Sequence, residues 1–169
     1  LAKPAIAISK GEGALLWDEN GKEYIDAIAS WWVNPYGHSN KFIADAIYAQ
    51  LTSLEHVLFG GFTHEPAVLL SEKLMQILPS NQKKLFYSDN GSTSVEIALK
   101  VALQYYYNKG EKRTKIIAFE NAFHGDTFAA MAASGISFFT EAFRGSLIEV
   151  VRIPVPTKGK EKELSLIHI

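Results

Sequence analysis

The pattern of apolar and polar positions predicts a β-hairpin near the start of the chain. Apolar runs at residues 14–18 and 23–28 flank Asn20-Gly21, a dipeptide that favours a tight turn between two strands. A loop of mixed aromatic and turn residues is expected from Ser30 to Asn40. The chain therefore opens with antiparallel strands.

Apolar residues at helical spacing predict two helices in the next part of the chain. Asn40 can cap the first helix. Its expected apolar face consists of Phe42, Ile43, Ala46, Ile47, Leu51 and Leu54. Thr63 and Pro66 are start signals for the second helix, and Pro79 is its stop signal.

From about residue 84 the pattern changes to alternating strands and helices. Strands are expected at 84–88, 115–119 and 148–153, and helices at 94–108, closed by Gly110, and at 126–134. This order predicts an α/β fold in which parallel strands are joined by helices. Ligand sites in such sheets lie beyond the carboxyl ends of the strands, so the loops that follow the strands are the candidate sites.

Composition narrows the function classes. The 169 residues carry 17 Lys and Arg against 18 Asp and Glu, a net charge of −1 that argues against bulk nucleic-acid binding. There is no Cys, so thiolate metal sites and Cys nucleophiles are excluded. No apolar run has the length of a membrane span. Because His38, His56 and His64 fall on separate loops without a metal-ligand spacing, no metal site is predicted.

The loop from Ser88 to Ser94 joins an expected strand to an expected helix. Unpaired N–H groups at a helix N-terminus attract a phosphate, Gly91 allows close approach, and Ser92 adds a hydroxyl donor. The loop has no Lys and lacks Walker A glycine spacing, so a single phosphate fits better than a nucleoside triphosphate. A plain helix cap is an equal alternative, because residues 93–96 match a capping box.

A second loop, residues 120–127, also follows a strand and opens a helix. Phe123 could stack on a planar ligand and Gly125 gives the backbone freedom. Taken alone, Phe123 and His124 are better read as a core aromatic and a locally bonded imidazole. In the loop after the hairpin, Trp31 and Trp32 cannot fill one core together, so they predict either packing between sub-domains or a substrate wall.

Taken together, these stretches resemble a known family, the class III aminotransferases that depend on pyridoxal 5′-phosphate. The stretches that carry the resemblance are Trp31-Trp32, Gly37-His38, residues 56–64, residues 88–100 and residues 123–127. The resemblance implies a fold-type I, three-layer α/β/α large domain. It also implies transfer of an amino group by a ping-pong reaction through the cofactor.

The resemblance also implies roles for particular residues. Gly91 and Ser92 would bind the cofactor phosphate, Phe123 would stack on the pyridine ring, and His124 would line the pocket. Tyr is more usual than Phe in the position of Phe123, so a substrate contact through that hydroxyl is in doubt. Trp31, supported by Trp32, would form a wall of the substrate site.

Within the class, Trp31-Trp32 and residues 56–64 indicate an enzyme of biotin synthesis. Its donor would be S-adenosylmethionine and its acceptor 8-amino-7-oxononanoate. The loop of residues 59–64 resembles a part that lies near the partner's active site in cytoplasmic homodimers. The alternatives are an ornithine, acetylornithine or ω-amino acid aminotransferase, or a non-catalytic phosphate-binding or dimerisation module.

The resemblance implies a division of the chain and a missing part. Residues 1–40 would contribute to the small domain and residues 41–163 would form the first half of the large cofactor-binding domain. Residues 164–169 are interpreted as a cloning or read-through scar. No lysine lies in a motif that matches the family's Schiff-base lysine, so no catalytic residue is identified. We therefore expect the 169 residues alone to be inactive.

Overall fold

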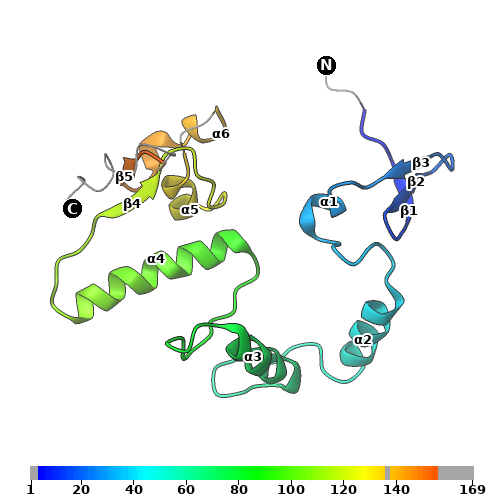
Figure 1. The fold of residues 1–169 in the computed structure, drawn as a ribbon, viewed down its shortest axis with the longest axis horizontal. Helices are drawn as coiled ribbons and strands as arrows, with labels where there is room; N and C mark the ends of the chain where they lie inside the picture. Colours follow the sequence, from blue (N-terminus) through cyan, green and yellow to red (C-terminus); the bar gives the residue numbers. More distant parts are fainter. Residues whose placement is uncertain (1–3, 136–137, 156–169) are drawn as a thin grey trace. The chain divides into compact units, whose positions relative to one another are not determined.

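The computed structural model describes residues 4–135 and 138–155 of the chain. The chain divides into two compact units, Leu1–Gln82 and Lys83–Ile169. Figure 1 shows the ribbon coloured along the sequence. The interpretation of residues 164–169 as a scar lies outside the described residues.

The first unit opens with a three-stranded antiparallel sheet. Its strands β1 (Ile8–Glu12), β2 (Leu15–Asp18) and β3 (Glu23–Ile25) are hydrogen-bonded in that order. The predicted hairpin is confirmed as β2 and β3. Strand β1 was not predicted, because its sequence ISKGE lacks the alternation of apolar and polar residues that marks a half-buried strand.

The carboxylate of Asp18 fixes the turn of the hairpin. It accepts hydrogen bonds from the amides of Asn20 (2.9 Å) and Lys22 (3.0 Å) and from the Tyr24 hydroxyl (2.9 Å). The bond from the Lys22 amide is the largest cause that lowers the pKa of Asp18, although burial opposes it. The bond to Asp18 raises the pKa of Tyr24. Asx-type bonding of this kind selects the turn locally.

Both helices predicted for the first unit are present. Helix α2 (Lys41–Leu51) begins after Asn40, whose side chain accepts from the Ile43 amide as expected. Helix α3 (Glu65–Ile77) has Pro66 in its first turn and ends before Pro79. Its cap is His64, not Thr63, because the His64 ring nitrogen accepts from the Ala67 amide at 3.4 Å.

The loop expected from Ser30 to Asn40 contains a short helical turn, α1 (Ala29–Trp32), that the sequence did not predict. Its four residues all have positive φ, from 47° to 71°. Ordinary L-residues rarely adopt this left-handed conformation, and surrounding contacts must hold it. Asp26 provides them, since one of its oxygens lies 2.7 Å from both the Ser30 hydroxyl and His38 Nε2.

Asp26→Asn is expected to remove an acid-sensitive part of the stability. The Ser30 amide and hydroxyl, then His38, hold the pKa of Asp26 at about 2, below the ordinary 3.8. A lowered folded-state pKa stabilises the protein above pH 3.8, and this stabilisation is lost as pH falls toward 2. Melting temperatures across this range should fall less steeply for the variant.

The matched control for this prediction is Asp45→Asn. Asp45 is an exposed carboxylate on α2 that pairs with Lys41 at 2.7 Å. Such surface pairs contribute little to stability. A pH profile of Asp26→Asn that parallels the wild type would show that the Asp26 contacts do not stabilise the turn.

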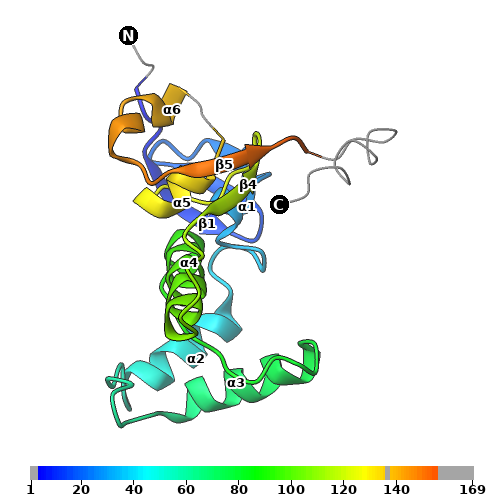
Figure 2. The same ribbon diagram turned by 90° about the vertical axis from the view of Figure 1, so that its left-hand side faces the viewer.

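From α4 onward, the second unit has the alternating order of helices and strands predicted for it. It contains α4 (Gly91–Asn108), β4 (Ile116–Phe119), α5 (Phe128–Ala133), α6 (Phe138–Glu141), a 3-10 turn (Arg144–Ser146) and β5 (Val150–Ile153). Strands β4 and β5 lie side by side and pair in parallel, with Ile116 opposite Val150 (Figure 2). Gly110, at φ +72°, follows the end of α4 as expected, whereas α6 and the 3-10 turn were not predicted.

The strand predicted at residues 84–88 is not formed. Among residues 4–135 and 138–155, β4 and β5 pair only with each other, so the sheet of this unit has two strands. A strand is maintained by its hydrogen-bonded neighbour, and the apolar run Leu85-Phe86 is not sufficient without one. Phe86 is exposed.

Helix α5 forms the buried centre of the second unit. Ala130, Met131, Ala132 and Ala133 are buried and pack near β4, where Ala118 is also buried. Small side chains allow the helix to approach the strand closely. This packing places the loop between β4 and α5 beside the N-terminus of α4, which α5 also contacts.

Candidate functional site

The loop of residues 88–94 is held as a helix N-terminus. Asn90 caps α4 by accepting from the Thr93 amide at 2.9 Å, and the Thr93 hydroxyl accepts from the Asn90 amide at 3.3 Å. The capping box is thus Asn90 with Thr93, and the box expected at residues 93–96 is wrong. The helix begins three residues earlier than predicted, which places Gly91 and Ser92 in its first turn.

The first turn of α4 has the properties of an anion site. Within the described part of the chain, the amides of Gly91 and Ser92 donate no hydrogen bond. Both amides belong to an 18-residue helix, whose dipole favours negative charge at this end. Gly91 is exposed, and a Cβ at its position would meet nothing within 4 Å, so the approach is open. The helix cap and the phosphate site predicted for this loop are therefore compatible.

The loop of residues 120–127 lies directly against this turn. The Thr127 amide donates to Ser92 Oγ at 2.9 Å, and the two hydroxyl oxygens are 2.7 Å apart. Gly125 makes the approach possible, because its Cβ would lie only 2.7 Å from the Ser92 Cα. Its φ of +129° is also a conformation that suits glycine. The two sequence-predicted loops are therefore joined in one site.

Phe123 and His124 lie on the loop that contacts Ser92. The interpretation of Phe123 as a core aromatic is wrong, because its side chain is 75% exposed. The His124 amide donates to the Ser134 hydroxyl at 2.9 Å, and that hydroxyl donates to the Ala130 carbonyl. The backbone of His124 is thus tied to the end of α5, which leaves the Phe123 ring available to a ligand.

Three residues that sequence reasoning missed hold this loop in place. Glu96 accepts from the amides of Ala129 (2.6 Å) and Ala130 (3.1 Å) at the start of α5. Arg152 on β5 donates to the carbonyls of Ala132 and Ser134 at the end of α5. Thr127 contacts Ser92, as described above. Thr127 belongs to the stretch that carried the resemblance, whereas Glu96 was assigned to a capping box that does not form.

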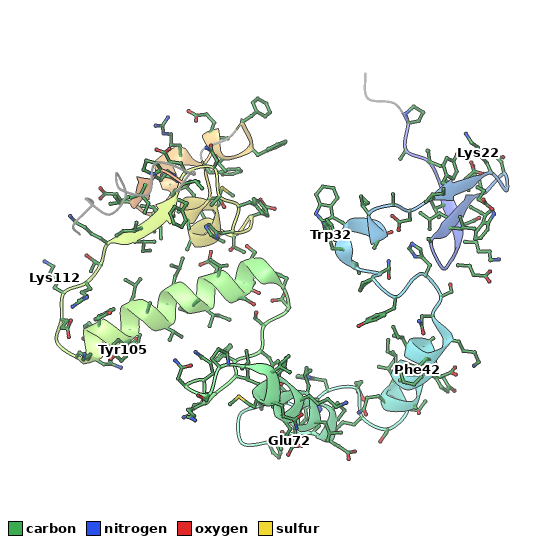
Figure 3. The ribbon with its side chains drawn as sticks, viewed as in Figure 1. Lys22, Trp32, Phe42, Glu72, Tyr105 and Lys112 are labelled. Atoms are coloured by element: carbon green, nitrogen blue, oxygen red, sulfur yellow. The ribbon has the colours of Figure 1, made fainter. Side chains whose placement is uncertain are left out.

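The tryptophan pair belongs to the first unit. Trp31 and Trp32 are 79% and 81% exposed, and Figure 3 shows Trp32 extending away from the ribbon of α1. The left-handed turn directs both rings outward. The role of the pair as a substrate wall stays a prediction.

The described residues contain neither a cluster suited to a metal ion nor a helix suited to span a membrane. Across residues 4–135 and 138–155, no group of three His, Asp or Glu side chains is arranged to hold a metal ion. In the same part of the chain, no helix has the length and apolar character needed to span a bilayer.

Comparison with known proteins decides the family. The sequence matches the class-III aminotransferase family over residues 2–168. The chain belongs to the class-III aminotransferases. Two named relatives are the adenosylmethionine-8-amino-7-oxononanoate aminotransferases of Synechococcus elongatus, 47% identical over 92% of this chain, and of Staphylococcus aureus, 43% identical over 90%.

Solved structures give the fold of this aminotransferase chain. The adenosylmethionine-8-amino-7-oxononanoate aminotransferase of Methanocaldococcus jannaschii superposes with a TM-score of 0.90 at 38% identity, covering 98% of this chain. The ω-transaminase of Pseudomonas jessenii in complex with PMP superposes at 0.83 and 28% identity, covering 90%. The predicted fold, that of the fold-type I aminotransferases, is confirmed.

The aminotransferase chain spans little more than a third of its relatives. It covers 37% of the Synechococcus protein, 35% of the Staphylococcus protein and 38% of the Methanocaldococcus chain. The activity, the substrates and the partners of a whole aminotransferase are therefore matters of proposal for this chain.

Proposed function

We propose that this chain forms part of an aminotransferase that moves an amino group from S-adenosylmethionine to 8-amino-7-oxononanoate in biotin synthesis. The observation that carries the proposal is the junction of the two loops, where the Thr127 amide meets Ser92 Oγ at 2.9 Å. The junction links a helix N-terminus with free amides to the loop that carries the exposed Phe123. Relatives at 38–47% identity that bear this activity in their names support the choice of substrates.

The residues present fit pyridoxal 5′-phosphate as the cofactor. The amides of Gly91 and Ser92 and the Ser92 hydroxyl would hold its phosphate, as the free first turn of α4 allows. The exposed ring of Phe123 would stack on the pyridine face, and His124 would line the pocket. When bound, the cofactor supplies the electron sink through which an amino group is exchanged.

The chain's own residues contribute binding and orientation. Anchored at Ser92, a planar ring can be held at a fixed angle against Phe123, because the loop that carries Phe123 is itself bonded to Ser92. Phe123 has no hydroxyl, so it cannot hydrogen-bond a substrate as Tyr would. Trp31 and Trp32 would provide apolar area for the large adenosyl group and the long acid chain.

We also propose the setting in which the site works. Residues 1–40 would belong to a small domain and residues 41–163 to the first half of the large domain. Two copies would form a cytoplasmic homodimer, with the loop of residues 59–64 near the partner's site. The exposed apolar side chains Leu58, Phe59 and Phe62 support an interface there.

A spectrum of the complete protein tests the proposed function. We expect pyridoxal 5′-phosphate to bind and give a stable absorbance band at a longer wavelength than the band of the free cofactor. S-adenosylmethionine added without acceptor should convert the bound cofactor to pyridoxamine 5′-phosphate. If only ornithine or an ω-amino acid converts the bound cofactor, the protein is still an aminotransferase, but S-adenosylmethionine is not its donor. A protein without any bound-cofactor band would contradict the proposal as a whole.

A further inference from the structure

The N-terminus of α5 is capped by a residue of another helix. Thr127 stands at the N-cap position of α5, yet its side chain makes no capping hydrogen bond. Instead Glu96, on α4, accepts from the Ala129 and Ala130 amides at 2.6 and 3.1 Å. These amides are among the donors that a helix N-terminus leaves without a partner. Glu96 therefore replaces the cap that Thr127 does not provide.

This replacement leaves Thr127 available to hold Ser92. The Thr127 amide donates to Ser92 Oγ at 2.9 Å, and Thr127 Oγ1 lies 2.7 Å from the same atom. The Thr127 side chain also hydrogen-bonds the Glu96 carboxylate. Ser92 and Glu96 are four residues apart and thus share one face of α4. The three side chains form a connected group from the start of α5 to the first turn of α4.

Glu96 acts as a hydrogen-bond acceptor in this group because its carboxyl group is ionised. Burial alone raises the pKa of Glu96, but the bonds from Thr127, Ala130 and Ala129 outweigh it, and the net pKa is lowered. The carboxylate is therefore ionised at neutral pH and can only accept. Either hydroxyl can be the donor in the 2.7 Å contact between Ser92 Oγ and Thr127 Oγ1, so the donors left open to an anion at the first turn of α4 are the amides of Gly91 and Ser92.

We propose that Glu96 is a positioning residue that keeps the loop of residues 123–127 docked on Ser92 and thereby shapes the cradle for the cofactor phosphate. The inference rests on the proposed function, because the anion served is that phosphate. Without Glu96, the Thr127 side chain turns to cap its own helix. Ser92 then loses its partner at the proposed phosphate cradle.

The test compares a ligand that has the phosphate with one that lacks it. In the complete protein, Glu96→Ala should weaken binding of pyridoxal 5′-phosphate about tenfold, as expected for one lost charge-assisted hydrogen bond. Binding of pyridoxal, which has no phosphate, should change little. Glu96→Gln keeps an oxygen that can accept from the α5 amides and should stay within about threefold of the wild type. Glu72→Ala, at an exposed glutamate of α3, is the matched control.

A double-mutant cycle asks whether Glu96 acts through Ser92. In a Ser92→Ala background, Glu96→Ala should cost much less phosphate-dependent affinity than it does in the wild type. Equal costs in both backgrounds would overturn the inference. If Glu96→Ala does not fold, as circular dichroism would show, the cycle is run with Glu96→Met, which also removes the acceptor but keeps most of the side-chain volume, and is read in the same way.

The outcomes separate this inference from the proposed function. A wild-type protein that does not bind pyridoxal 5′-phosphate contradicts the proposed function. A wild type that binds it, with a Glu96→Ala variant that binds equally well or loses both ligands equally, contradicts only the role of Glu96. Loss confined to the phosphate-bearing ligand supports it.

Discussion

Replacing Gly125 by alanine should abolish cofactor binding by the complete protein. The new Cβ would lie 2.7 Å from the Ser92 Cα, and it would also contact the Ser92 side chain. A backbone atom of a helix cannot move aside as the end of a flexible side chain can. The φ of +129° at this position adds strain for any residue with a Cβ. Overpacking and strain together should cost about 2–4 kcal/mol.

The expected loss is large because the clash involves the backbone of α4. The loop of residues 120–127 can relieve the clash only by leaving α4, which breaks the bonds of Thr127 to Ser92. Titration with pyridoxal 5′-phosphate, followed by absorbance, should show a dissociation constant at least a hundredfold larger. This corresponds to a loss of about 3 kcal/mol of binding free energy. Thermal unfolding should show the destabilisation.

The control for this prediction is Gly145→Ala, in the 3-10 turn. A Cβ there meets nothing within 4 Å, and its φ is not in the left-handed region. This variant should unfold and bind cofactor as the wild type does. Wild-type cofactor affinity in Gly125→Ala would show that the contact between the two loops is not needed for the site.

Arg152→Met should loosen the loop of residues 120–127 at the end of α5, to which this loop is bonded. One guanidinium nitrogen of Arg152 donates to the carbonyls of Ala132 (2.7 Å) and Ser134 (2.9 Å). These carbonyls lie at the end of α5 and have no helical partner. Removing the donor leaves them unsatisfied in a mostly buried place, at a cost of about 2 kcal/mol. Met keeps most of the side-chain volume, so cavity formation contributes little.

Hydrogen exchange gives the measurement for this second prediction. Amides of residues 124–134 should exchange faster in Arg152→Met, because the His124 amide is bonded to Ser134, whose carbonyl Arg152 holds. Arg144→Met is the control, since its ion pair with Glu141 at 3.6 Å is exposed. Protection equal to that of the wild type in both variants would mean that Arg152 does not restrain the loop.

Local chemistry made part of the fold predictable from sequence. Asn20-Gly21 and Asn40 act through their immediate neighbours, and the hairpin and the cap of α2 were both confirmed. The strand at residues 84–88 was wrong because pairing depends on a neighbouring strand, which a single segment does not encode. The left-handed turn of Ala29–Trp32 was missed because its cause, Asp26 bonded to His38, lies outside the turn.

The candidate site shows the same division between local and distant causes. The predicted loops were located correctly, since helix N-termini and glycines are visible in the sequence. Their junction was not predicted, because it depends on contacts such as Ser92 with Thr127, 35 residues apart. For this reason Glu96 was assigned to a capping box at residues 93–96 that does not form. A carboxylate near a helix start fits a capping box in the sequence, while the actual partners are amides 33 and 34 residues away.

The hydrogen bonds described above fall into two sets that are separate in the sequence. The hydrogen bonds that shape the first turn of α4 and the loop beside it lie between Asn90 and Arg152, and those that hold the tryptophan turn lie between Asp26 and His38. Under the proposed function, selection could therefore change the donor preference through residues 26–38 separately from the residues proposed to hold the cofactor.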